Sequence, residues 1–260
     1  MTDELVHLAR EHGVATITLD SPHNRNALSR QLLGDLRAHL DAALVDAAAR
    51  VIVIEATGPA FCAGADLKEA RSRNEERRSG DGNIFAEILS DIWQSPKPVV
   101  ARVQGPARAG GIGLMAACDI SVAVESATFG FSEVRIGVAP AIISVVVLPK
   151  IGITRGMEYF LTGNVFDART AAEMGLITSA VPATSLDATV AEYVEALRAG
   201  GPHALGACKR LVRDVPGLAL GDGFAMASPL SAELFASDEA REGMTAFAEK
   251  RQPSWLEALS

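Results

Sequence analysis

The chain has 260 residues, of which 48% are apolar, 22% charged and 5% aromatic, and its formal net charge at pH 7 is −8. This apolar content excludes a disordered chain and is typical of one large α/β core, with or without a small appendage. The negative charge argues against nucleic acid as a partner, because nucleic acid selects basic surfaces. A small phosphate-bearing ligand is not excluded, since it needs only two or three local cations.

Neither a metal site nor a membrane segment is indicated. The cysteines Cys62, Cys118 and Cys208 form no CxxC pair, and the histidines have no ligand spacing, which predicts reduced thiols, no metal and a cytoplasmic protein. The longest uncharged apolar run, 136–149, is too short for a bilayer and contains two prolines, so a buried turn and helix is expected there. The first residues lack the basic and apolar regions of a signal peptide.

The predicted elements begin with a strand, 14–20, whose β-branched residues alternate. Apolar residues recur at helical spacing from Ala27 to Ala43, and Ser29 or Asn26 is suited to cap that helix. The later patterns predict strands at 51–58 and 97–105, a helix at 84–93, a strand with a hairpin-like extension at 118–131, and helices at 185–199, 202–213 and 231–250. We therefore expect an α/β core followed by a helical C-terminal region.

Two stretches place small residues where a strand gives way to a helix. In "RAGGIGLMAACD" (108–119) a helix is predicted to begin near Gly110, although neither the Walker spacing nor the dinucleotide-binding spacing is present. In "FCAGADLKEA" (61–70) a helix near Asp66 exposes the amide of Ala65. Either stretch alone is equally explained by tight packing or ordinary turn chemistry. Together, the two strand-to-helix turns would allow two backbone amides to donate to one oxygen, as an oxyanion hole requires.

Four ordered motifs strengthen this interpretation. They read "AFCAGADLKE", then V-x-G-x-x-x-x-GG followed by "ACDI", then "FGFSEVRIG", and finally "DEAREGMTAFAEKR". In this order they resemble the crotonase superfamily of enoyl-CoA hydratases and isomerases, from about Val14 to Arg251. The "SEVRIGVAPAIIS" stretch is similar to members resembling methylglutaconyl-CoA hydratase. The resemblance implies a core of repeated ββα units in a spiral, at residues 1–200, and a helical cap or trimerisation region at 201–260.

The resemblance also implies roles for single residues. The thioester carbonyl of an acyl-CoA is expected to lie between the amides of Ala65 and Gly110, with Glu133 as the catalytic acid/base. An ordinary surface ion pair with Arg135 is the competing explanation for Glu133. The expected substrate-binding residues are Ala63, Asp66, Lys68, Gly113, Ala141, Phe247 and Lys250, with the loop "SPHNRNA" and Lys68 near the adenosine end. Phe247 and Lys250 would come from the same or a neighbouring subunit, and both lysines are equally consistent with solvated surface charges.

Two departures from the family pattern bear on the chemistry. Many hydratases of the family have a second glutamate three residues after the oxyanion glycine, where this chain has Gly113. Either the second acid was dispensed with, or its space serves a branched or longer acyl group. After Glu133 the chain reads "APAIIS" in place of "PGAGGT", and its apolar residues Ala141, Ile142 and Ile143 are expected to shape the acyl pocket.

The favoured activity is therefore hydration of a 2-enoyl-CoA, within fatty acid metabolism. A single glutamate also suits an enoyl-CoA isomerase, and the missing acid leaves open a non-catalytic acyl-CoA-binding member. The resemblance implies no cofactor beyond the CoA of the substrate, no nucleic acid or membrane partner, and assembly as a homotrimer or homohexamer.

Overall fold

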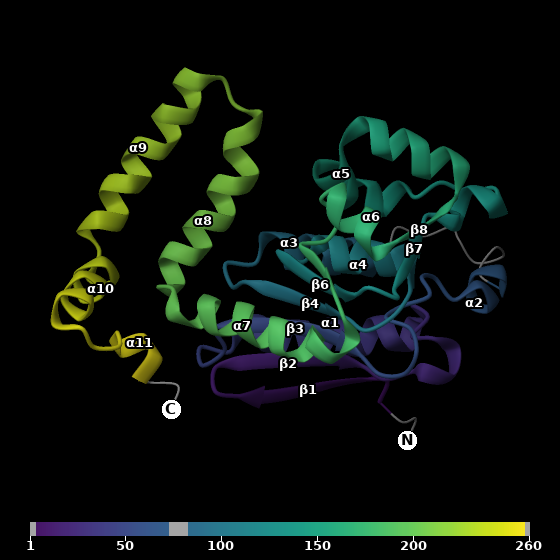
Figure 1. Ribbon diagram of the computed structural model, residues 1–260, viewed down its shortest axis with the longest axis horizontal. Coiled ribbons are helices and arrows are strands. Elements are labelled where there is room, and N and C mark those ends of the chain that lie inside the picture. Colours follow the sequence, from purple (N-terminus) through teal and green to yellow (C-terminus); the bar gives the residue numbers. More distant parts are fainter. Residues whose placement is uncertain (1–3, 73–82, 258–260) are drawn as a thin grey trace.

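The computed structural model describes residues 4–72 and 83–257, and its centre is a six-stranded sheet (Figure 1). The strand order is β1 (Val6–Glu11), β2 (Val14–Leu19), β3 (Val51–Ala56), β4 (Val99–Val103), β6 (Ile120–Val124) and β9 (Ser179–Val181). Only the β1–β2 pair is antiparallel. Five of the six β3 residues are buried, as expected for a strand covered on both faces. Strand β1 was not predicted from the sequence; it forms a hairpin with β2 through His12 and Gly13.

A second, three-stranded sheet corrects the expected hairpin at 118–131. Its strands are β5 (Ala107–Arg108), β7 (Thr128–Gly130) and β8 (Val165–Asp167), in the order β5-β7-β8. β7 does not fold back on β6 but pairs in parallel with β5 and antiparallel with β8. This pairing brings the segment before Gly110 beside the segment before Glu133.

The helices of the first 200 residues surround the two sheets. They are α1 (Arg30–Val45), α2 (Leu67–Ser72), α3 (Ile84–Gln94), α4 (Gly110–Ala117), α5 (Ala141–Thr162), α6 (Ala168–Glu173) and α7 (Leu186–Ala199). Helix α1 begins at Arg30 and not at Ala27. Of the two expected caps Ser29 is the one formed, because its Oγ accepts a hydrogen bond from the Leu32 amide at 3.2 Å, whereas the Asn26 side chain bonds to the backbone of other segments. Helix α1 packs on β1 and β2, and α7 packs on β3, β4 and β6. Every residue of α4 is buried, so this short helix lies inside the core.

The apolar run at 136–149 is helical only in part and is not wholly buried. Its first residue, Ile136, ends the 3₁₀ segment η3 (Ser132–Ile136), residues 137–140 connect η3 to α5, and 141–149 form the first turns of α5, which kinks at Gly152. Ile136, Val138 and Val145 are exposed, whereas Ile143 is buried. In the described ranges no helix combines the length and apolar composition needed to cross a membrane.

The C-terminal region is helical, as predicted, and extends away from the sheet (Figure 1). It consists of α8 (Pro202–Asp214), α9 (Leu220–Ala236), α10 (Asp238–Glu249) and α11 (Ser254–Glu257). The single helix expected at 231–250 is instead two helices, because Ser237 ends α9 and caps α10. Helix α9 has no buried residue, which leaves large apolar side chains such as Phe224 and Phe235 exposed. The domain boundary near residue 200 stays a prediction.

Candidate active site

The turn before α2 leaves the amide of Ala65 without an acceptor. Leu28 pairs with this turn on both sides of Ala65: its N–H donates to the Gly64 carbonyl at 2.8 Å, and its carbonyl accepts from the Asp66 amide at 3.4 Å. The N–H of Ala65 therefore faces away from Leu28. It has no hydrogen-bond acceptor among the described residues.

A second free amide begins helix α4. Gly110 is the first helical residue, and the first bonds inside the helix run from the Ile112 and Gly113 amides to the Ala109 carbonyl. The described part of the chain offers no acceptor for the Gly110 N–H, which lies at the positive end of the helix dipole. Ala109 reaches this position with a φ of 48°, a conformation that is strained for alanine.

The two turns touch one another at Gly64. A Cβ placed on Gly64 would lie 3.3 Å from the Gly110 nitrogen and 2.8 Å from the Arg108 carbonyl oxygen. Gly64 also has a φ of +84°, so both its conformation and its surroundings require glycine. The packing explanation and the oxyanion explanation are therefore not alternatives here: close packing at Gly64 brings together the backbones that carry the two free amides.

Glu133 lies on η3, and although the residue is only half-buried, one of its two carboxylate oxygens is enclosed without a partner. Its Oε2 is buried and has no hydrogen-bond partner among the described residues, and this loss of hydration raises the pKa of the Glu133 carboxyl. The ion pair with Arg135 is not formed: the Arg135 guanidinium instead donates to Asn164 Oδ1 at 3.5 Å. Gly130, three residues before Glu133, accepts a hydrogen bond from the Ala109 amide at 3.2 Å. The second sheet therefore holds the segment of Glu133 against the start of α4.

The space beside Gly113 is already filled. A Cβ on Gly113 would overlap the Cγ2 atom of Ile143, would lie 2.8 Å from Ile143 Cβ, and would be 3.6 Å from Leu89 Cδ1. The two explanations expected for Gly113 were a dispensed acid and space for a larger acyl group, and neither included a side chain that fills this space. The place where the second glutamate would stand is occupied by an aliphatic side chain from α5.

The other predicted site residues lie in the turn before α2 and in α2 itself, at the start of α5, or in and directly after α10. Asp66 caps α2 by accepting from the Lys68 and Glu69 amides, so its carboxylate has a structural role. Ala63 lies in the same turn, where its amide donates to the Arg25 carbonyl, while Lys68 and Ala141 are exposed. Phe247 and Lys250 lie in and directly after α10, and α10 and α2 are at opposite ends of the molecule (Figure 1). One chain therefore does not bring these two residues to the site.

Three apolar neighbours of the site were missed in the sequence. A Cβ on Gly110 would lie 2.8 Å from Leu28 Cδ1 and 3.4 Å from the Phe85 ring, and Leu89 lies near Gly113. Leu28, Phe85 and Leu89 fitted ordinary helix patterns, so no local signal separated them from other core residues.

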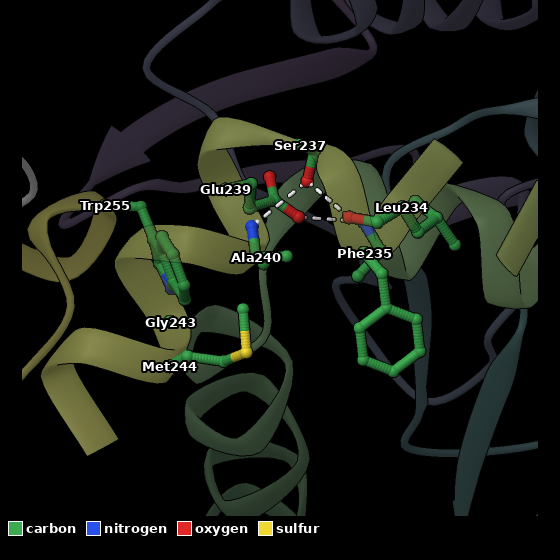
Figure 2. A pocket seen from close by; sticks show the side chains of 10 residues that line it. Leu234, Phe235, Ser237, Glu239, Ala240, Gly243, Met244 and Trp255 are labelled. Atoms are coloured by element: carbon green, nitrogen blue, oxygen red, sulfur yellow. Dashed lines mark hydrogen bonds between the residues drawn. The ribbon is translucent and has the colours of Figure 1, made fainter. Parts of the chain in front are cut away.

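A cavity of 310 Å³ lies elsewhere, among α8, α9, α10 and α11 (Figure 2). Glu239 is its one acidic residue, and both oxygens of this carboxylate accept hydrogen bonds from the His203 and Ala204 amides at the start of α8. The other labelled side chains that line it, such as Phe235, Met244 and Trp255, are mostly apolar (Figure 2). The carboxylate of this cavity is therefore used to cap α8. Among the described residues, no cluster of three or more histidine, cysteine or acidic side chains could hold a metal ion.

Two free amides on turns that touch at Gly64, and a desolvated carboxylate on a segment that the second sheet holds against one of those turns, are the groups required by a class of site that binds a carbonyl oxygen gaining negative charge while a proton is transferred. The chain belongs to the enoyl-CoA hydratase/isomerase family, whose model matches residues 9–258.

Individual relatives agree with this assignment. The enoyl-CoA hydratase EchA19 of Mycobacterium tuberculosis is 34% identical, covering 92% of this chain and 91% of its own. The mitochondrial methylglutaconyl-CoA hydratase of Mus musculus is 30% identical, covering 96% and 82%. The crystal structure of an enoyl-CoA hydratase from Shewanella pealeana superposes with a TM-score of 0.90 at 30% identity, covering 96% of each chain. The crotonase-like α/β fold with a helical C-terminal region is thereby confirmed.

Proposed function

We propose that the protein adds water to a 2-enoyl-CoA thioester. The amides of Ala65 and Gly110 donate to the thioester oxygen, and Glu133 accepts a proton from water as the water oxygen bonds to the β-carbon. The carbon–carbon π electrons move toward the carbonyl, which gives an enolate held by the two amides. Glu133 then returns its proton to the α-carbon, so that one carboxylate serves both steps.

The observation that carries this proposal is the state of Glu133. A buried carboxylate oxygen without a partner destabilises the folded protein, and structural carboxylates avoid this through hydrogen bonds. A raised pKa brings the group closer to neutral pH, where an acid/base catalyst is effective in both of its forms.

A second candidate function is isomerisation of a 3-enoyl-CoA to a 2-enoyl-CoA. It is favoured by the Gly113–Ile143 contact, which leaves Glu133 as the one carboxylate assigned to the reaction. Moving a proton from one carbon to another needs one base, whereas hydration also requires that water be held in position.

The two activities are separated by the mass of the product. The protein is incubated with crotonyl-CoA in water enriched in oxygen-18, and in parallel with 3-hexenoyl-CoA. Hydration adds one labelled water to crotonyl-CoA, which is the expected result. Conversion of 3-hexenoyl-CoA without a change in mass, together with unchanged crotonyl-CoA, would favour the isomerase. No conversion of either thioester at high protein concentration would indicate a non-catalytic binding member.

We further propose that the protein assembles as a trimer, or as a hexamer made of two trimers. Helix α9 lacks any buried residue, and Phe247 on α10 is 86% exposed, an arrangement that a second subunit would cover. Assembly would also give Phe247 and Lys250 a route to the site of a neighbouring subunit. Sedimentation at micromolar concentration should give three or six times the mass of one chain, and a stable monomer would contradict the proposal.

A further inference from the structure

Ile143 lies where α5 meets α4 and is almost fully enclosed. Its exposed fraction is 3%, and its Cβ and Cγ2 atoms fill the space that a side chain at Gly113 would take. Leu89 of α3, also 3% exposed, lies on the same side of Gly113. These contacts enclose the glycine with aliphatic groups from two other helices.

This space lies close to where the reacting carbons would be. Gly113 is three residues after Gly110, so it lies about 4.5 Å further along the helix and on the same face. When the Gly110 amide binds the thioester oxygen, the α-carbon is one bond beyond the carbonyl carbon and the β-carbon two bonds beyond. The wall formed by Ile143 is therefore within reach of a substituent on the β-carbon.

The neighbouring residues of α5 are placed differently. Ala141 and Ile142 are exposed, whereas Ile143 supplies the two atoms nearest to the position of a Cβ on Gly113. Ile143 is thus the residue of the "AIIS" segment that closes the interior beside α4.

We propose that Ile143 determines acyl specificity by limiting the size of the substituent on the β-carbon, so that unbranched 2-enoyl groups are preferred over 3-methyl-branched ones. The inference rests on the proposed function for the placement of the thioester. It also assigns Ile143 a second effect, which is to exclude a carboxylate at position 113 and leave Glu133 to work alone.

The test compares Ile143→Ala with Ile151→Ala. Both changes truncate an isoleucine on α5 of similar burial, 3% and 6% exposed, but Ile143 and not Ile151 supplies the atoms nearest to a Cβ on Gly113. The measured quantity is kcat/KM for 3-methylcrotonyl-CoA divided by kcat/KM for crotonyl-CoA. Ile143→Ala should raise this ratio about tenfold, since pocket methyl and methylene groups discriminate by about that factor or more. Ile151→Ala should leave it within twofold of the starting protein.

An unchanged ratio in a folded Ile143→Ala protein, or an equal rise in both variants, would overturn the proposal. Should Ile143→Ala not fold, Ile143→Leu removes the Cγ2 branch at nearly constant side-chain volume, and the ratio should then rise about fourfold, the effect of one methyl-sized group withdrawn from this wall. The ratio of dissociation constants for the two thioesters, measured by calorimetry, tests the same steric limit without turnover. A failure of the proposed function, in which neither thioester is hydrated, is therefore distinct from a failure of the role of Ile143.

Discussion

Glu133→Gln should lower kcat/KM on the best thioester substrate by about 10²- to 10⁴-fold, the usual contribution of one general acid/base group. Glutamine keeps the shape of the side chain but does not accept the proton from water. The two amides are unaffected, so thioester affinity measured by calorimetry should change by only a few fold. Glu125→Gln, at an exposed glutamate after β6, is the matched control and should retain full activity. Near-normal turnover by Glu133→Gln would contradict the assignment of Glu133 as the acid/base.

The same substitution has an expected signature in stability and pH dependence. Because the folded state raises the pKa of Glu133, the folded protein binds a proton more tightly than the unfolded chain does. Ionisation of Glu133 therefore lowers stability as pH rises from the ordinary glutamate range through the raised pKa. Glu133→Gln removes this loss, so its thermal midpoint at neutral pH should be no lower than that of the starting protein. The acid limb of kcat/KM should show a pKa above the ordinary value of 4.5 and should be absent from the variant's residual activity.

Features that depend on neighbours in the chain were predicted well from the sequence. The start of α4 at Gly110 follows from a run of glycines after a strand, and the Ser29 cap follows from a serine directly before an apolar helix pattern. The buried strand β3 is predicted by a continuous apolar run. Each of these is decided within a few residues, so the pattern alone carries the information.

Features decided by distant contacts were not predicted. The partner of β7 is β5, more than a dozen residues earlier, and the 118–131 sequence contains no signal for this strand pairing. The exposure of Ile136 and Val145 depends on which face of η3 and α5 meets the core. The contact of Ile143 with Gly113 joins residues of two helices, so the sequence alone showed an absent glutamate and not the side chain that fills its place.

Gly113→Ala should destabilise the fold by about 1–3 kcal/mol, the range for overpacking a well-filled core. Its new methyl group would overlap Ile143 Cγ2, and α4 is buried on all sides, so either α5 or the oxyanion helix must shift. Gly34→Ala is the matched control: Gly34 also lies inside a helix, α1, but a Cβ there meets nothing within 4 Å. That change should stabilise the protein by about 0.5–1 kcal/mol through helix propensity alone. Urea unfolding midpoints of the two variants should move in opposite directions.

A double substitution tests the cause of the Gly113 effect. With Ile143 reduced to alanine, its Cβ would still lie 2.8 Å from the new one, so the strain is fully relieved only by Ile143→Gly. Gly113→Ala combined with Ile143→Gly should therefore lose less stability than the sum of the two single losses, because the residues occupy one space. Additive losses would show that Gly113 is needed for another reason. Gly113→Glu carries the same overlap and adds a charge between Ile143 and Leu89, so we expect it to disrupt thioester binding and not to restore a second catalytic acid.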